Sequence, residues 1–291
     1  MITFLSLGFK GFFLIQNLPS KYYSLIDCVV VGRDEGVKND YSKELITWCK
    51  ERKLPYLERS EFNILKSSSD YLILLGWRWL INPPEKKEII VFHDSLLPKY
   101  RGFNPLVTAL IEGDEEIGAT AIFANSDFDS GNIIFQKSIR IKHPIKINQV
   151  IQKVANLYLE MFLEIASYIE ENRPIPSVPQ NNQQATYSLW RDEDDYFIDW
   201  TMDSDMILRK IYASGEPYLG AKTNFEGEKL RIFDAKVVED VQIVNRTPGK
   251  VIFKKEGNPV VVCGQGLLMI TDIRDDSGNS FTFPRFRVKL F

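Results

Sequence analysis

Residues 88–129 read EIIVFHDSLLPKYRGFNPLVTALIEGDEEIGATAIFANSDFD, and this stretch decides how the rest of the chain is interpreted. An apolar run, Ile89–Phe92, carries His93 to the expected end of a strand. A second apolar strand, at about 118–124, leads into an acidic loop that ends at Asp129. A base and a carboxylate at the exits of two strands are typical of an active site.

The length, composition and net charge of the chain limit the number of its domains and the kinds of partner that we expect. At 291 residues the chain is long enough for about two domains. Its net charge of −3 and pI near 5.6 argue against nucleic acid as a partner, because nucleic-acid-binding surfaces are usually strongly basic. We also expect no membrane partner, because no window has the roughly 18 uncharged apolar residues of a membrane span. The three cysteines form no CxxC pair, and the apolar N-terminus lacks the basic segment of a signal peptide, so we expect a cytoplasmic protein.

Apolar strands that alternate with amphipathic helices predict an α/β fold whose parallel sheet is covered on both faces. In such sheets ligands bind beyond the carboxyl ends of the strands, where Gly76, Trp77, His93 and Asp129 all fall. We expect strands at about 1–7, 26–31, 71–75, 89–92, 118–124 and 132–141, and helices at about 12–18, 41–52, 104–112 and 146–171.

A polar stretch with three prolines, 172–184, breaks this periodicity and predicts a linker between domains. We therefore assign residues 1–184 to the catalytic domain and residues 185–291 to a second domain. The second domain has one short helix, at about 205–213, and short strands separated by glycine or aspartate turns, which favours a small β-barrel. These strands are expected at about 221–225, 230–238, 249–253, 260–263, 267–273 and 281–288.

The candidate chemistry rests on His93 and Asp129, because the carboxylate can hold the imidazole and stabilise its protonated form. His143 lies beside Pro144 on an expected surface turn and has no such partner. The chain has no GxSxG motif, and its two histidines cannot supply an HExxH motif, so we expect neither a protein nucleophile nor a metal. A histidine and an aspartate without a nucleophile suit direct transfer between two bound substrates.

The motifs around this pair extend the interpretation. His93 is followed by SLLPKYRG (95–102), GAT (118–120) and DFDSGN (127–132), and later by YSLWRDED (187–194), IDW (198–200) and PYLGA (217–221). Together they resemble the formyltransferases that use 10-formyltetrahydrofolate, a family of methionyl-tRNA, glycinamide ribonucleotide and sugar N-formyltransferases. The resemblance implies a one-carbon transferase with an N-terminal Rossmann-like domain and a C-terminal OB-like β-barrel.

By this resemblance, His93 is the general base or acid for the attacking amine, and Asp129 orients it. 10-Formyltetrahydrofolate is the implied formyl donor, with apolar walls from Trp77 and Phe103. The implied folate-binding residues are Leu75, Gly76, Trp77, Phe103, Asn125, Ser126, Asp127, Phe128 and Asp129.

Two positions depart from the family pattern. Val91 stands where the family has an asparagine that polarises the formyl oxygen, and Asp94 stands where a glycine usually follows the histidine. Because valine cannot donate a hydrogen bond, the oxyanion needs another donor. Protonated His93, Asn125 and Asn82 are the alternatives that the sequence leaves open, as is an inactive enzyme.

Three classes of molecule could supply the amine that accepts the formyl group. A tRNA needs broad phosphate contacts, which are poorly supported by 14 Lys/Arg against 13 Asp/Glu from Tyr196 onward. A glycinamide ribonucleotide enzyme would not need the second domain. We therefore expect a nucleotide-linked amino sugar (UDP or dTDP). The resemblance implies a 4-amino-4,6-dideoxy sugar of bacterial glycan biosynthesis.

Two alternatives to this acceptor stay open. One is methionyl-tRNA, and the other is a carrier-bound aminoacyl group, with the barrel as a protein-docking surface. The sequence also leaves a homodimer open. The residues expected to bind the acceptor are Lys99, Tyr100, Arg101, Arg191, Tyr218 and Lys222.

Overall fold

The computed structural model describes residues 1–81 and 87–291, which form two compact units. The first unit comprises Met1–Leu106, Glu116–Arg140 and Val150–Leu189. The second comprises Val107–Glu115, Ile141–Gln149 and Trp190–Phe291. The main changeover therefore lies between Leu189 and Trp190, shortly after the boundary predicted at 184.

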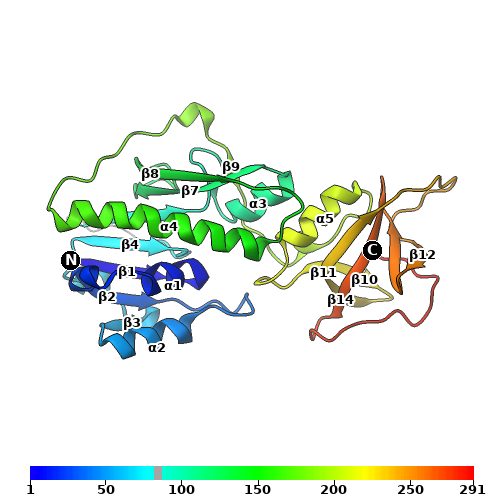
Figure 1. Cartoon of the computed structure of the whole chain (residues 1–291), viewed down its shortest axis with the longest axis horizontal. Helices are drawn as coiled ribbons and strands as arrows, with labels where there is room; N and C mark the ends of the chain where they lie inside the picture. The colour runs from blue at the N-terminus through cyan, green and yellow to red at the C-terminus, as the bar shows by residue number, and fades with distance from the viewer. Residues whose placement is uncertain (82–86) are drawn as a thin grey trace. The chain divides into compact units, whose positions relative to one another are not determined.

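A seven-stranded sheet organises the first unit (Figure 1), in the order β3-β2-β1-β4-β5-β7-β8. The five strands from β3 to β5 are parallel, which confirms the predicted α/β fold. The sheet strands are β1 (Ile2–Ser6), β2 (Ile26–Val31), β3 (Tyr56–Glu58), β4 (Tyr71–Leu75), β5 (Glu88–His93), β7 (Glu116–Phe123) and β8 (Ile133–Arg140). A separate short pair joins β6 (Arg101–Gly102) to β9 (Tyr187–Ser188).

Strand β7 runs antiparallel to β5, which corrects the expectation of a parallel sheet throughout. His93 pairs with Thr120 and Ile90 with Phe123, so β7 ends beside the beginning of β5. Both strands are largely buried, and a strand buried on both faces has an apolar sequence in either direction. The prediction that Asp129 follows a strand ending at the same edge as His93 is therefore wrong.

Helix α4 (Ile147–Glu170) lies across one face of this sheet (Figure 1). Its Phe162 ring is 5.1 Å from that of Phe4, and its Tyr158 ring is 4.9 Å from that of Phe92. The other α-helices of the described residues are α1 (Gly8–Gln16), α2 (Ser42–Arg52), α3 (Pro105–Glu112) and α5 (Ser204–Ala213). Among the described residues, none of the helices has the length and apolar character needed to cross a membrane.

Helix α1 begins at Gly8, earlier than the predicted residue 12, because Gly8–Gly11 is a helical turn and not a loop. Gly11 allows this helix to approach the sheet closely, since a Cβ atom there would lie 2.2 Å from Ser6 Oγ. The helix therefore holds Lys10 close to the carboxyl ends of the central strands.

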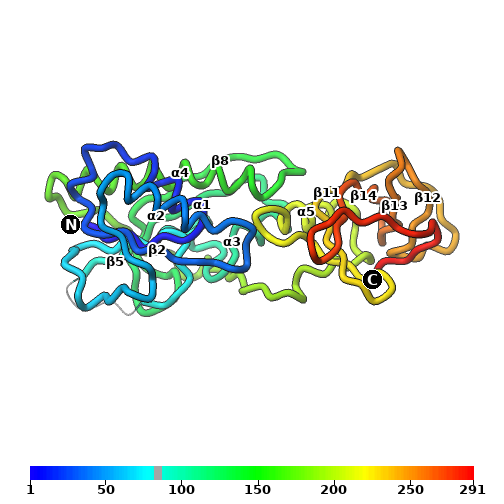
Figure 2. The backbone as a smooth tube through the Cα atoms, turned by 90° about the horizontal axis from the view of Figure 1, so that it is seen from below, coloured from blue at the N-terminus to red at the C-terminus, as the bar shows by residue number. Residues whose placement is uncertain are grey.

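The second unit contains a five-stranded antiparallel sheet in the order β10-β11-β14-β13-β12. Its strands are β10 (Ala221–Phe225), β11 (Glu228–Val238), β12 (Val251–Lys255), β13 (Asn258–Val262) and β14 (Leu267–Asp275). The red C-terminal segment runs along this unit (Figure 2). The strand expected at 281–288, all of which is described, does not form. This segment contains Pro284, which cannot donate to a ladder.

The last residues of the chain connect the two edge strands of this sheet. Phe291 exchanges backbone hydrogen bonds of 2.8 and 3.0 Å with Asn224 of β10. Leu290 donates to the Gly249 carbonyl at 2.8 Å, and Val251 of β12 donates to the Val288 carbonyl at 3.1 Å. Because both edges are paired, the sheet closes as the predicted β-barrel.

Candidate active site

The His93 ring, at the end of β5, is held between two oxygen atoms. The side chain is 8% exposed, with Nε2 2.8 Å from the Tyr100 carbonyl oxygen and Nδ1 3.6 Å from Asp129 Oδ2. A carbonyl oxygen only accepts, so Nε2 carries the proton of the neutral ring. Nδ1 is then the free base, and it faces a carboxylate that stabilises the ring once it is protonated.

Tyr100 presents its carbonyl from a left-handed backbone conformation, with φ of 57°. Its own N–H donates to Thr186 Oγ1 at 2.9 Å, and Ser188 Oγ lies 3.5 Å from its carbonyl oxygen. A positive φ in a tyrosine is unfavourable unless surrounding contacts hold it. These contacts come from Thr186 and Ser188, which follow directly after the predicted linker.

Asp129 reaches His93 from a loop that folds back toward β5. Its φ is 51°, and its Oδ2 accepts a hydrogen bond of 2.8 Å from the Gly102 N–H. Gly102 has a φ of 101°, and a Cβ atom there would meet the Ser188 carbonyl oxygen at 2.6 Å. The structure thus brings His93 and Asp129 together as expected, but through this loop and not through a shared strand edge.

Asp94 is held in a buried cluster with Lys10 of α1 and Tyr158 of α4. Its carboxylate forms an ion pair with Lys10 and accepts a hydrogen bond of 2.6 Å from the Tyr158 hydroxyl. Burial, reinforced by the charge of Asp94, raises the pKa of Tyr158 well above its ordinary value, so the hydroxyl stays protonated as a donor. Sequence reasoning noted Asp94 only as a departure and missed its two partners. An acid in place of the usual glycine was the available signal, because a buried charge needs a partner.

The turn after Asp94 is fixed by Thr120 of β7. The Thr120 hydroxyl donates to the Ser95 carbonyl at 2.6 Å and accepts from the Leu97 N–H at 3.2 Å. Gln136 of β8 donates to the same hydroxyl and to the Leu97 carbonyl. This network sets the path of the chain from His93 to Tyr100.

The surroundings of Val91 and of Asn125 are described by the structure, and which donor replaces the usual asparagine stays open. Val91 packs on the apolar cluster that includes Leu5, Leu72 and Ile89. The Asn125 amide donates to Ser130 Oγ at 2.9 Å within its own loop. Asn82 lies outside the described residues.

The residues expected to hold folate differ in what they would offer a ligand. Gly76 has a φ of 64°, and a Cβ atom there would lie 2.7 Å from the Leu7 carbonyl oxygen. The Trp77 indole N–H is buried and has no partner among the described residues, so it is a donor that a bound carbonyl can use. Leu75 is fully buried and offers only its backbone, whereas Phe103 and the loop residues Asn125, Ser126, Asp127 and Phe128 are exposed.

The residues expected to bind the acceptor divide between the two units. Arg101, 4% exposed, donates to Gln180 and Asn182 of the first unit. Lys222, 1% exposed, forms an ion pair with Glu193 of the second unit. Burial and pairing argue against direct acceptor contact for both. The assignments of Lys99, Tyr100, Arg191 and Tyr218 stay predictions.

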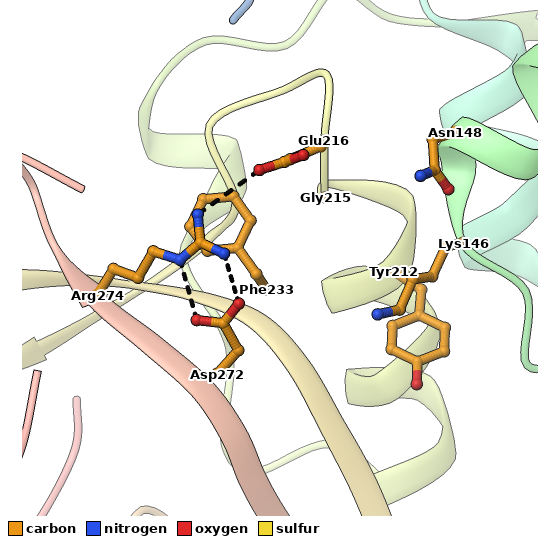
Figure 3. A pocket seen from close by; sticks show the side chains of 8 residues that line it. All are labelled: Lys146, Asn148, Tyr212, Gly215, Glu216, Phe233, Asp272 and Arg274. Carbon is orange, nitrogen blue, oxygen red and sulfur yellow. Dashed lines mark hydrogen bonds and ion pairs between the residues drawn. The ribbon is translucent and has the colours of Figure 1, made fainter. Parts of the chain in front are cut away.

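A pocket of about 170 Å³ lies in the second unit (Figure 3). Arg274 lies over the Phe233 ring and pairs with Asp272 and Glu216, while Lys146 pairs with Asp234. Burial, together with a hydrogen bond to Asp234, raises the pKa of Tyr212 to about 12. The pocket contains none of the predicted site residues, and its cations are already neutralised. Its lining residues are Lys146, Asn148, Tyr212, Gly215, Glu216, Phe233, Asp272 and Arg274.

Two segments of the chain match known protein families. Residues 57–165 match the family Formyl transferase, and residues 191–287 match the family Formyl transferase, C-terminal domain. The chain is also 31% identical over 195 residues to the methionyl-tRNA formyltransferase of Carboxydothermus hydrogenoformans. This match covers 67% of the chain and 62% of the relative, so the chain spans less than two thirds of that protein.

Solved structures share the fold over most of the chain. The N-formyltransferase from Helicobacter canadensis, in complex with folinic acid and dTDP-3-aminofucose, superposes with a TM-score of 0.65 at 16% identity. That likeness covers 94% of this chain and 99% of the other. The sugar 3N-formyl transferase WlaRD, with dTDP and 5-N-formyl-THF, gives a TM-score of 0.63 at 18% identity and covers 92% and 96%.

Proposed function

Because the chain belongs to the formyl transferase family, we propose that it transfers a formyl group from 10-formyltetrahydrofolate to the amine of a nucleotide-linked amino sugar. The observation that carries this choice of acceptor is the ion pairing of the second unit. Arg231, Arg246, Arg274 and Arg285 each pair with a carboxylate of the same unit. A tRNA is bound by cations that are free to neutralise phosphates, whereas a nucleoside diphosphate needs only a few.

In this proposal, side chains of the chain itself would take up the proton of the acceptor amine. When bound, 10-formyltetrahydrofolate supplies the formyl group. His93 Nδ1 would accept the proton that the acceptor amine loses, and Asp129 would stabilise the resulting imidazolium. The imidazolium would then return the proton to the folate nitrogen from which the formyl group has left. General base catalysis of this kind contributes roughly 10²- to 10⁴-fold to a rate. Phe103 and Phe128, which are 45% and 67% exposed, offer aromatic faces for a pterin or a pyrimidine.

Methionyl-tRNA is the second candidate acceptor. It is favoured by the similarity of the chain to the methionyl-tRNA formyltransferase of Carboxydothermus hydrogenoformans. The net charge of −3 and the paired arginines count against it, because both reduce the attraction for a polyanion.

The acceptor is tested with the full chain and 10-formyltetrahydrofolate on a panel of dTDP- and UDP-linked sugars. The panel should carry the amine at position 3 or position 4, with initiator methionyl-tRNA as the competing acceptor. Formylation of one nucleotide sugar, at a rate well above that with the tRNA, is the expected result. Turnover of methionyl-tRNA alone would contradict the proposal.

The assigned roles are tested with His93→Asn and Asp129→Ala. Each variant should lower kcat by about 10²-fold or more, while the affinity for 5-formyltetrahydrofolate, measured by tryptophan fluorescence, stays within about twofold. His143→Asn is the matched control, since His143 hydrogen-bonds the Asp114 carbonyl oxygen of the second unit. Wild-type rates in either site variant would refute the proton-transfer role.

A further inference from the structure

The predicted linker is hydrogen-bonded to both loops that surround His93. We call residues 178–188 the strap. At its start, Val178 pairs with Ile133 of β8 through two backbone hydrogen bonds of 2.8 Å. At its end, Ser188 accepts a hydrogen bond of 3.0 Å from the Phe103 N–H. Between these points, the side chains of Gln180, Asn182 and Thr186 reach the loops.

Gln180 joins the loop of Asp129 to Arg101. Its amide nitrogen donates to the Asp129 and Gly131 carbonyl oxygens, both at 2.8 Å. Its amide oxygen accepts from Arg101 Nε at 3.1 Å and Arg101 Nη2 at 2.7 Å. Both donors and both acceptor positions of the amide are therefore used. The contacts hold Asp129 in the left-handed conformation that directs its carboxylate at His93.

Thr186 holds the other partner of His93. Its hydroxyl accepts from the Tyr100 N–H at 2.9 Å, and its carbonyl accepts from the Arg101 N–H at 2.8 Å. Its own N–H donates to the Pro98 carbonyl at 3.1 Å. Tyr100 is thereby fixed on both sides of the carbonyl that binds His93 Nε2.

We propose that the strap is a positioning element of the site, in which Gln180 and Thr186 fix the two oxygen atoms that hold the His93 ring. Neither residue touches the ring itself. They act through the Asp129 carboxylate at Nδ1 and the Tyr100 carbonyl at Nε2. The expected change in kcat rests on the proposed function, whereas the expected change in the His93 ring does not.

The kinetic test compares Gln180→Glu with Gln183→Glu. The first variant keeps the shape of the side chain, loses both donors and sets a carboxylate against two carbonyl oxygens. The second makes the same change on an exposed strap residue whose side chain forms no hydrogen bond within residues 1–81 and 87–291. Gln180→Glu should lower kcat by about 10- to 100-fold with KM for the formyl donor within about twofold. Gln183→Glu should match the wild type.

A second pair of variants tests Thr186 without changing its volume greatly. Thr186→Val removes the hydroxyl that receives the Tyr100 N–H and should lower kcat by about tenfold. Thr186→Ser keeps the hydroxyl and should restore most of the rate. This pair also tests the inference if Gln180→Glu does not fold.

The structural test uses ¹⁵N-histidine-labelled full chain and needs no substrate. The chain has only two histidines, so the His93→Asn spectrum assigns the ring signals. Wild type and Gln183→Glu should show the neutral His93 ring protonated at Nε2. Gln180→Glu and Thr186→Val should show altered His93 ring shifts, or a second tautomer, with His143 unchanged.

Altered His93 signals without turnover of any sugar in the panel would support the strap and refute the proposed acceptor. If kcat per folded molecule and the His93 signals both stay at wild-type values while only the Tm falls, the strap is merely structural. A lower kcat with unchanged His93 signals would also overturn the inference, because the effect would not pass through the ring.

Discussion

The His93 ring has one committed nitrogen and one free nitrogen, and this asymmetry sets where a proton can be received. Nε2 is bound to the Tyr100 carbonyl oxygen at 2.8 Å, so in the proposed reaction the acceptor amine would approach Nδ1. Asp129 Oδ2 is 3.6 Å from that nitrogen, which is too long for a hydrogen bond. In the proposed reaction the carboxylate would therefore act on the protonated ring through its charge.

A substitution of Val91 tests whether the oxyanion of the proposed reaction lacks a hydrogen-bond donor. It lies two positions before His93 on β5, and alternate residues of a strand share a face. Val91→Asn places an amide donor on that face and should raise kcat by about tenfold, which is less than the roughly 10²- to 10³-fold lost when an established oxyanion donor is removed. Steady-state rates with the acceptor found by the sugar panel measure this effect.

Val91→Asp is the control, because it has nearly the shape of asparagine and no donor when ionised. Both variants lose the same contact with the apolar cluster, and the charge of the aspartate should lower the stability further, so the rates are compared per folded molecule. Equal rates in the two variants, at or below the wild-type rate, would mean that the oxyanion already has a donor elsewhere.

At the scale of elements, the short segment around Glu193 depends on charges from two strands. Glu193 forms ion pairs with Lys222 of β10 and with Arg231 of β11. Burial alone would raise the pKa of its carboxyl, but the hydrogen bond from Lys222 and the charge of Arg231 bring it below the ordinary value of 4.5. Because the pKa of Glu193 is lower in the folded chain than in the unfolded chain, the ion pairs stabilise the fold fully at pH values above the unfolded-state pKa. This stabilisation is lost as the pH falls through the folded-state pKa.

Glu193→Gln should therefore destabilise the chain at neutral pH and have little effect in acid. We expect a loss of about 2 kcal/mol at pH 7, below the 3–5 kcal/mol of a fully buried pair because Glu193 is half exposed. Calorimetric Tm values of the variant and the wild type, measured between pH 3.5 and 7, should approach each other as pH falls below 4.5. Glu239→Gln, at an exposed glutamate outside the described ion pairs, should follow the wild type throughout. A Tm difference for Glu193→Gln that does not change with pH would contradict this account.

Much of the element order could be predicted from the sequence, because apolar runs and helical spacing depend on burial alone. Strand direction could not, since β7 is equally apolar read either way. The strand expected at 281–288 was wrong for a different reason: its apolar residues pack into the barrel core without forming a ladder. The His93–Asp129 pair was found from its motif, whereas Gln180 was not, because a glutamine in a proline-rich stretch has no periodic or charge signal.

At the scale of the molecule, each unit has its own sheet, and the second depends on the end of the chain for closure. Leu290 is buried in the core of the barrel, and the backbone of Phe291 pairs with Asn224. Unpaired edge strands expose hydrogen-bonding groups that recruit other chains. The last three residues should therefore contribute both to stability and to the protection of the edge strands from association.

Deleting residues 289–291 should lower the free energy of unfolding of the second unit by about 3 kcal/mol or more. Urea titration followed by tryptophan fluorescence measures this change, and light scattering reports edge-to-edge association. Leu290→Ala is the matched comparison, since it removes the buried side chain and leaves the backbone pairing. The deletion should cost more than the substitution and leave the His93 ring signals unchanged. If the deletion and Leu290→Ala lower the free energy of unfolding equally, the backbone pairing of the last residues adds no stability beyond that of the buried leucine side chain.

The ion pair between Lys10 and Asp94 has a consequence for how related sequences vary. The two residues are 84 positions apart, and either charge alone would be left in a largely buried site. In chains that carry an acid directly after the motif histidine, selection should therefore retain a cation in the helix after the first strand. In chains with a glycine there, that helix position should drift. Joint inheritance of these two positions would then mark a subgroup of the family that neither residue identifies alone.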